Sequence, residues 1–169
     1  MRVSATPLFS APEIAERIAA LGAQIGRDYH GKPVLALGVL KGATFFFADL
    51  VRAIPGDVRI GFMESKRRDA DAGHVEITYR SSSPLQGENI LLIDAVVDTG
   101  ITLEYLIREL QRLGAAEVRV AALISKAAGR RVAVPVDYVG FNAPDRFLVG
   151  YGLDYDEKYR NLPFITFVE

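Results

Sequence analysis

Three nearly continuous apolar runs, each of strand length, limit what this chain can fold into. They span residues 33–40 (PVLALGVL), 90–97 (ILLIDAVV) and 118–124 (VRVAALI). A run without a polar face is typical of a strand that is buried on both faces. These runs therefore predict the central strands of a sheet that is covered on both sides.

Helical patterns alternate with these strands. The first begins at Ser10, where Ser10 and Glu13 match a capping box ahead of apolar residues at helical spacing. Two more helices are expected at 44–54 and 103–113, and Gly114 ends the second of them. Because strands and helices alternate, we expect an α/β fold with a mostly parallel twisted sheet flanked by helices.

Two further strands are expected at 58–64 and 75–79, where apolar and polar residues roughly alternate. The segment between them is polar and charged throughout. It is either a solvated hairpin loop or a mobile lid beside a site, and we treat about 65–75 as a flexible loop.

The C-terminal part of the chain has a different pattern. Short strand candidates at 138–141 and 147–151 are separated by Pro144 and lack a helix of comparable length. We expect them to form a small addition to the main sheet. The chain is thus predicted to be one domain over residues 1–169, with hood elements at about 1–12 and 138–169.

Composition excludes several classes of protein. The 20 basic and 21 acidic residues give a net charge of -1, which argues against a broad nucleic-acid surface. The absence of cysteine excludes a cysteine nucleophile, a zinc ribbon and an iron-sulfur site. The chain has no apolar run near the ~20 residues of a membrane span, and residues 1–10 lack a signal-peptide pattern. We expect a cytoplasmic protein with no membrane or nucleic-acid partner.

The most informative segment follows the second apolar run. The strand at 90–97 ends in DTGIT at 98–102 and turns into a helix. This arrangement places backbone N–H groups, two hydroxyls and the positive end of a helix dipole at one point. Gly100 permits a tight turn, and Thr99 and Thr102 can donate to phosphate oxygens. The pattern predicts a phosphate site beyond the carboxyl end of a strand.

The Asp-Thr-Gly triplet at 98–100 also occurs in other classes of protein. It carries the catalytic aspartate of acid proteases, but those enzymes are all-β, whereas this triplet lies between a buried strand and a helix. The P-loop pattern and the Gly-x-Gly-x-x-Gly pattern of dinucleotide-binding folds are both absent from the sequence. The phosphate-site interpretation is therefore preferred.

Residues 90–103 resemble the signature of the type I phosphoribosyltransferases: an apolar strand, two acidic residues, two apolar residues and Asp-Thr-Gly-x-Thr. Residues 39–50, Lys126 after its strand, and residues 139–160 extend this resemblance to the hypoxanthine-guanine branch of the family. The resemblance covers about residues 34–165, and its four segments occur in the right order.

The resemblance implies an activity. Members of this branch transfer the phosphoribosyl group of phosphoribosyl pyrophosphate to hypoxanthine or guanine. The products are IMP or GMP and pyrophosphate, and the reaction serves purine salvage. The resemblance further implies Mg²⁺ as cofactor and a homodimer or homotetramer.

The resemblance also implies which residues hold the ribose phosphate. The 5′-phosphate would lie on a loop of mostly backbone donors, formed by Asp98, Thr99, Gly100, Ile101 and Thr102. Asp98 would point at the base near N7 and accept a proton there as general base. Asp94, in the preceding strand, would bind the ribose hydroxyls.

Other residues would hold the pyrophosphate and the metal. Lys41 and Gly42 resemble the pyrophosphate loop of the family, and Arg160 would add positive charge from the C-terminal part. Asp154, together with Asp94, is the expected magnesium ligand, because Mg²⁺ prefers carboxylates and bridging phosphates. Judged without the resemblance, Lys41 and Arg160 are also compatible with surface cations, and Asp154 with a turn residue.

The base would lie against three residues. Lys126 has only donors, so it would bind the 6-oxo group of a purine and select against adenine. Phe147 would stack on the base, and the backbone at Leu148 would read its Watson-Crick edge. Judged without the resemblance, both residues are also compatible with ordinary core positions.

Two positions depart from the family pattern. The signature has two adjacent carboxylates before Asp-Thr-Gly, where this chain has Asp94 and Ala95. Because a charged hydrogen bond contributes on the order of 1.5-3 kcal/mol, we expect Ala95→Asp to restore a ribose contact. In the flexible loop, Lys66 stands where the family usually has tyrosine. Lys66 and the two arginines after it either reach the pyrophosphate or form a solvated charge run.

Two other functions stay open. Ala95 favours a regulator on the same fold that binds phosphoribosyl pyrophosphate or a nucleotide with little turnover. A transferase for xanthine or a pyrimidine is the third possibility, although Lys126 and Phe147 argue against a pyrimidine. His30 and His74 are interpreted as polar turn residues.

Overall fold

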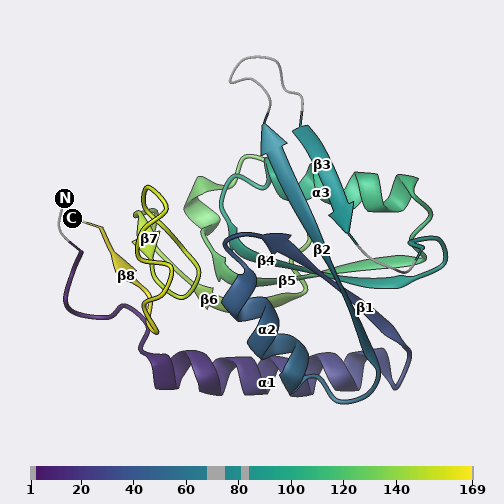
Figure 1. The fold of residues 1–169 in the computed structure, drawn as a ribbon, viewed down its shortest axis with the longest axis horizontal. Helices are drawn as coiled ribbons and strands as arrows, with labels where there is room; N and C mark the ends of the chain where they lie inside the picture. The colour runs from purple at the N-terminus through teal and green to yellow at the C-terminus, as the bar shows by residue number, and fades with distance from the viewer. Residues whose placement is uncertain (1–2, 68–74, 81–83, 169) are drawn as a thin grey trace.

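A six-stranded sheet is the centre of the molecule. The structure, a computed structural model, describes residues 3–67, 75–80 and 84–168. The strands are β1 (Val34–Leu40), β2 (Val58–Arg67), β3 (Val75–Arg80), β4 (Asn89–Val97), β5 (Glu117–Ser125) and β6 (Tyr138–Asn142). Their order in the sheet is β3-β2-β1-β4-β5-β6, with β3 antiparallel to β2 and the other pairs parallel (Figure 1). The expectation of a mostly parallel sheet is confirmed.

Helices cover both faces of this sheet. Helices α1 (Ala11–Tyr29) and α2 (Thr44–Ala53) pack on one face, where Ile14 and Phe46 share a core with Leu91 of β4. Helix α3 (Ile101–Arg112) packs on the other face, where Leu106 joins a core with Leu92. Because β1, β4 and β5 are buried between the two layers, their sequences are apolar on both faces.

The N-terminus of α1 follows the predicted capping box. The Glu13 backbone N–H donates to Ser10 Oγ at 3.5 Å, and the Ser10 N–H donates to the Glu13 carboxylate at 2.8 Å. The other end of the helix is capped by His30, whose φ of 50° lies in the left-handed region. His30 is therefore a turn residue as expected, whereas His74 lies outside the described residues.

The hood is formed by both ends of the chain. Strands β7 (Leu148–Val149) and β8 (Thr166–Phe167) pair antiparallel, and Val3 and Phe9 bridge to Val168 and Ile165. Figure 1 shows this hood at one end of the molecule, beside the main sheet. The strand expected at 138–141 forms β6 and pairs with β5, so this segment is the expected addition to the main sheet, and the C-terminal part of the hood is built from residues that follow it.

Other boundaries differ modestly from the expectations. The expected strand at 147–151 is cut to two residues because Gly150 and Tyr151 have positive φ values of 98° and 50° and turn the chain. The predicted flexible loop at about 65–75 falls mainly on residues outside the described part, so it stays a prediction. Among the described helices, none combines the length and apolar character that a membrane span requires.

Candidate functional site

Three predicted site residues or loops follow three neighbouring parallel strands. Lys41 follows β1, the 98–102 loop follows β4, and Lys126 follows β5. In the sheet β4 lies between β1 and β5, and these strands run in the same direction. Their carboxyl ends therefore meet at one edge of the sheet, which is where open α/β sheets bind ligands.

A cavity of about 390 Å³ lies at this edge. It brings together residues predicted for the pyrophosphate, the base and the metal, from both the sheet and the hood. Its lining consists of Lys41, Gly42, Val96, Lys126, Phe147, Leu148, Leu153, Asp154 and Arg160. A larger cavity of about 560 Å³, lined by α1, α2 and parts of the hood, contains none of the predicted residues.

A smaller cavity of about 100 Å³ lies beside the first and shares Val96 with it. It holds Asp94 and most of the predicted phosphate loop: Asp98, Thr99, Gly100 and Thr102. Ile101 does not line this cavity, and its side chain is 41% exposed at the first position of α3. Apart from Ile101, the residues predicted for the 5′-phosphate therefore line one cavity, and those predicted for the base and the pyrophosphate line the adjacent one.

The phosphate loop is held in a tight turn. Gly100 has a φ of 84°, and a Cβ atom there would lie 2.7 Å from the Val132 carbonyl oxygen. The backbone N–H groups of Arg131 and Val132 both donate to the Thr99 carbonyl, at 2.9 and 3.0 Å. Glycine is therefore needed for space as well as for backbone conformation.

Asp98 lies against the short 3₁₀ helix η1 (Ala127–Gly129), which follows β5. A Cβ atom on Gly129 would overlap the Asp98 carboxylate, so the close approach requires glycine. Sequence reasoning missed Gly129, because nothing in its neighbourhood along the chain marks it as a partner of Asp98.

Arg130 is a second residue that sequence reasoning missed. Its Nη2 donates to Ser125 Oγ at 3.1 Å and to the Val97 carbonyl at 3.4 Å, which ties the end of β5 to the end of β4. Its Nη1 is buried and has no hydrogen-bond partner among the described residues. Arg130 thus supports the strand ends that carry Asp98 and Lys126.

Asp94 and Ala95 lie on opposite faces of β4. Asp94 lines the smaller cavity, and its Oδ1 accepts the Ala95 backbone N–H at 2.7 Å. Burial raises the pKa of the Asp94 carboxyl to about 6 against the opposing effect of the backbone N–H groups of Ala95 and Val96.

Ala95 is 4% exposed in the core beneath α1 and α2. A Cβ atom on Gly42 would lie 3.4 Å from the Ala95 Cβ, so position 95 faces the pyrophosphate loop.

The predicted base-binding residues have distinct environments. Lys126 is buried, and its Nζ donates to the Arg146 carbonyl at 2.8 Å. Phe147 is 55% exposed, so it is not a core residue, and its ring meets the Tyr155 ring edge-on at 5.4 Å. Leu148 is buried in the core and also lines the cavity.

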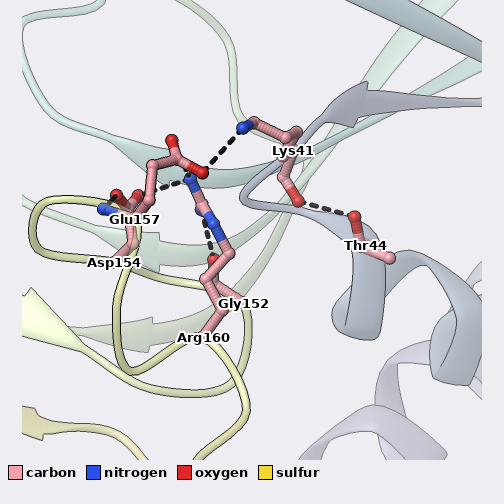
Figure 2. Close-up of polar contacts among 6 residues, drawn as sticks. All are labelled: Lys41, Thr44, Gly152, Asp154, Glu157 and Arg160. Atoms are coloured by element: carbon pink, nitrogen blue, oxygen red, sulfur yellow. Dashed lines mark hydrogen bonds and ion pairs between the residues drawn. The ribbon is translucent and has the colours of Figure 1, made fainter.

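The predicted pyrophosphate residues take part in a cluster of charges (Figure 2). Lys41 Nζ lies 2.7 Å from Glu157 Oε2, and Arg160 Nη2 lies 2.8 Å from Asp154 Oδ1 and 3.1 Å from Glu157 Oε1. The hydrogen bond from Lys41, and after it the one from Arg160, lowers the pKa of the Glu157 carboxyl below its usual value, against an opposing effect of desolvation. Sequence reasoning missed Glu157, which comes from a turn far from Lys41 along the chain.

The start of the pyrophosphate loop is fixed by its own contacts. The peptide bond between Leu40 and Lys41 is cis, and the Lys41 carbonyl accepts bonds from Thr44 Oγ1 at 2.6 Å and from the Thr44 N–H at 3.1 Å. The Gly152 turn approaches so closely that a Cβ there would overlap the Gly42 carbonyl. The hood and the loop are thus in direct contact.

The carboxylates of the site suit a metal that is held partly by substrate. In the part of the chain that the structure describes, no group of three or more metal-ligating side chains comes together. Asp94 and Asp154 line different cavities. Mg²⁺ commonly binds one or two carboxylates, several waters and substrate phosphates, so this donor set fits Mg²⁺ and does not fit a structural zinc site.

Known proteins are similar to this chain in sequence and fold. Residues 4–156 match the phosphoribosyl transferase domain family. The hypoxanthine-guanine phosphoribosyltransferase of Bacillus subtilis is 38% identical over 161 residues, which is 94% of this chain and 89% of that protein. The bifunctional protein TilS/HprT of Listeria innocua is 40% identical over 161 residues, but this chain spans only 25% of its length.

A solved structure of similar shape agrees with these matches. The crystal structure of a hypoxanthine-guanine phosphoribosyltransferase from Bacillus anthracis superposes with a TM-score of 0.94 at 34% identity. The superposition covers 99% of this chain and 100% of that one. Since the family match extends over most of the chain and the fold agrees throughout, this chain belongs to the phosphoribosyl transferase family.

Proposed function

We propose that this protein is an enzyme that transfers the phosphoribosyl group of phosphoribosyl pyrophosphate to hypoxanthine or guanine. The products are IMP or GMP and pyrophosphate, as in purine salvage. One observation carries the proposal: a single cavity joins Lys126 and Phe147 to the cations Lys41 and Arg160, beside the loop that begins at Asp98. The relatives named above support it.

Recognition of the base is assigned to Lys126 and Phe147. Lys126 Nζ uses one proton on the Arg146 carbonyl and retains two more donors, which match an acceptor such as the 6-oxo group. The 6-amino group of adenine cannot accept that bond, so a buried lysine selects against it. The exposed ring of Phe147 offers a stacking surface, and the backbone at Leu148 is proposed to read the Watson-Crick edge.

The chemistry is assigned to Asp98 and the phosphate loop. The loop offers backbone N–H groups and the Thr99 and Thr102 hydroxyls at the N-terminus of α3, which suits the 5′-phosphate. Asp98 accepts the proton that the purine releases as its nitrogen bonds to the ribose. Lys41 and Arg160, with the Gly42 backbone, stabilise the negative charge on the departing pyrophosphate.

Mg²⁺ is proposed to bind through Asp154 on the pyrophosphate side and Asp94 on the ribose side. When bound, it supplies positive charge that neutralises the diphosphate oxygens. Asp154 is positioned by Arg160 and by the Glu157 backbone N–H, which donates to Asp154 Oδ2 at 2.9 Å.

We further infer a cytoplasmic homodimer or homotetramer with no membrane or nucleic-acid partner. In the similar hypoxanthine phosphoribosyl transferase of Trypanosoma cruzi, the C-terminal region has a role in the oligomeric state and the enzymatic activity. That relative supports an assembly of several copies.

A direct assay tests the proposal. The protein is mixed with Mg²⁺, phosphoribosyl pyrophosphate and each of hypoxanthine, guanine, xanthine and adenine in turn, and nucleotide formation is measured. We expect hypoxanthine or guanine to react and adenine to react roughly 10⁴-fold less well. Comparable rates with adenine would refute the role of Lys126.

A second candidate is a regulator that binds phosphoribosyl pyrophosphate or a nucleotide with little turnover. Ala95 favours it, because the family signature has a carboxylate there. The same assay separates the two: tight nucleotide binding with negligible turnover on all four bases would favour the regulator.

A further inference from the structure

Glu157 lies between the two cations of the proposed pyrophosphate site. One carboxylate oxygen, Oε2, is 2.7 Å from Lys41 Nζ, and the other, Oε1, is 3.1 Å from Arg160 Nη2. Figure 2 shows the carboxylate reaching toward both cations from the turn that contains Asp154. A carboxylate that bridges two cations uses the same contacts that two oxygens of a diphosphate would use.

Glu157 itself is not enclosed. Its side chain is 65% exposed, and that of Lys41 is 57% exposed. Glu157 does not line the cavity that Lys41 and Arg160 line, so it reaches the two cations from outside. The carboxylate can therefore move into solvent without opening the core.

Arg160 would keep its position if Glu157 moved away. Its Nη1 donates to the Gly152 carbonyl at 2.7 Å, and its Nη2 also bonds the Asp154 carboxylate at 2.8 Å. Its side chain is only 23% exposed. Loss of Glu157 would free Lys41 and remove one of the two carboxylates on Arg160 Nη2. The Arg160 guanidinium would stay in place through Gly152 and Asp154.

We propose that Glu157 is an internal competitor of the substrate diphosphate: its carboxylate holds Lys41 and Arg160 in the ligand-free protein, and the diphosphate binds by displacing it. This inference rests on the proposed function, because it takes Lys41 and Arg160 as pyrophosphate ligands. It assigns Glu157 a role in setting affinity for the diphosphate end of the substrate and for the product pyrophosphate. Glu157 is a positioning residue, since it acts through the two cations.

The test compares Glu157→Gln with a matched control. Asp156→Asn removes the same unit of charge from the neighbouring residue, whose carboxylate lies 3.9 Å from Lys158 and is exposed. Binding of inorganic pyrophosphate with Mg²⁺ is measured by calorimetry for the wild type and both variants. Steady-state KM values for phosphoribosyl pyrophosphate and hypoxanthine are measured in parallel.

We expect Glu157→Gln to bind pyrophosphate about three- to tenfold more tightly than the wild type, because two partly exposed ion pairs no longer have to be broken. The KM for phosphoribosyl pyrophosphate should fall in the same proportion, with the KM for hypoxanthine unchanged. Asp156→Asn should change both values less than twofold. A purely structural role for Glu157 would not separate the two KM values in this way.

Three results would overturn the inference. Unchanged or weaker pyrophosphate binding by Glu157→Gln, with measurable binding by the wild type, removes the competitor role and leaves the proposed function standing. Equal tightening by Asp156→Asn shows a general charge effect in place of a specific contact. If the wild type binds no pyrophosphate and forms no nucleotide, the proposed function fails and the inference falls with it.

Discussion

Gly129 leaves free the space that the Asp98 carboxylate occupies, because a Cβ atom on Gly129 would overlap Asp98 Oδ1. The two residues lie on different segments, Gly129 at the end of η1 after β5 and Asp98 directly after β4. The hydrogen bonds of Arg130 to Ser125 and Val97 hold these two strand ends together. The orientation of the proposed general base is therefore set partly by a glycine that has no chemistry of its own.

Gly129→Ala tests this relationship. The added methyl group must push the Asp98 carboxylate aside, and a displacement of about 1 Å in a reacting group can reduce turnover on the order of 10²-fold. We expect kcat to fall by about 10- to 100-fold with little change in the unfolding temperature. Ala128→Ser, an exposed change in the same turn, is the control. Normal kcat in Gly129→Ala would show that the contact does not orient Asp98.

Asp98→Asn tests the general base directly. The amide keeps the shape and a polar contact of the carboxylate but cannot accept the proton. Turnover should fall about 10²- to 10⁴-fold while the dissociation constant for IMP changes little. Single-turnover kinetics with an independent measurement of nucleotide binding separate the two effects. Near-normal turnover would contradict the role assigned to Asp98.

Asp94 should make the stability of the metal-free protein depend on pH. Burial raises its pKa in the folded protein to about 6. The unfolded chain has an ordinary aspartate pKa of about 3.9, so between about pH 4 and 6 the folded form binds more protons. The free energy of unfolding therefore falls as pH rises through this window.

Asp94→Asn should remove this fall in the free energy of unfolding with rising pH. We expect the variant to be about 1-3 kcal/mol more stable than the wild type at pH 8, with the difference vanishing near pH 4. Urea unfolding at several pH values, in the presence of a chelator, measures this difference in the free energy of unfolding. Asp145→Asn, a change at an exposed residue, serves as the control. The same variant should lose catalytic efficiency, because the proposed ribose contact is gone. A constant stability difference across pH would contradict the raised pKa.

Ala95→Asp is expected to act on the pyrophosphate loop. The sequence-based expectation was a restored ribose contact, but Ala95 faces Gly42, whereas Asp94 lines the cavity of the phosphate loop. A carboxylate at position 95 would add negative charge next to the loop. Without Mg²⁺, pyrophosphate should bind about three- to tenfold more weakly, and the dissociation constant for IMP should change less than twofold. A clear gain in IMP affinity would instead favour the ribose contact.

Local patterns in the sequence were sufficient for the long helices, the strands of the main sheet and part of the site. The capping box at Ser10 depends on contacts within a few residues, and the Asp-Thr-Gly pattern marks the turn at Gly100, so both can be read from neighbouring positions. The contacts that hold the Gly100 turn come from Arg131 and Val132, which are distant along the chain. The apolar runs at β1, β4 and β5 predicted a sheet covered on both faces. Since parallel strands align their carboxyl ends, the sequence also predicted that a ligand site follows β4.

Contacts between distant segments were decided only by the tertiary structure. Glu157 and Lys41 are 116 positions apart, and no local pattern relates a glutamate in a C-terminal turn to a lysine after the first strand. The same holds for Gly129 against Asp98 and for the pairing of β6 with the main sheet. The physical reason is that capping hydrogen bonds and the spacing of apolar residues are local features, which determine helices and strands over a few residues. Which surfaces meet depends on how all the elements pack together.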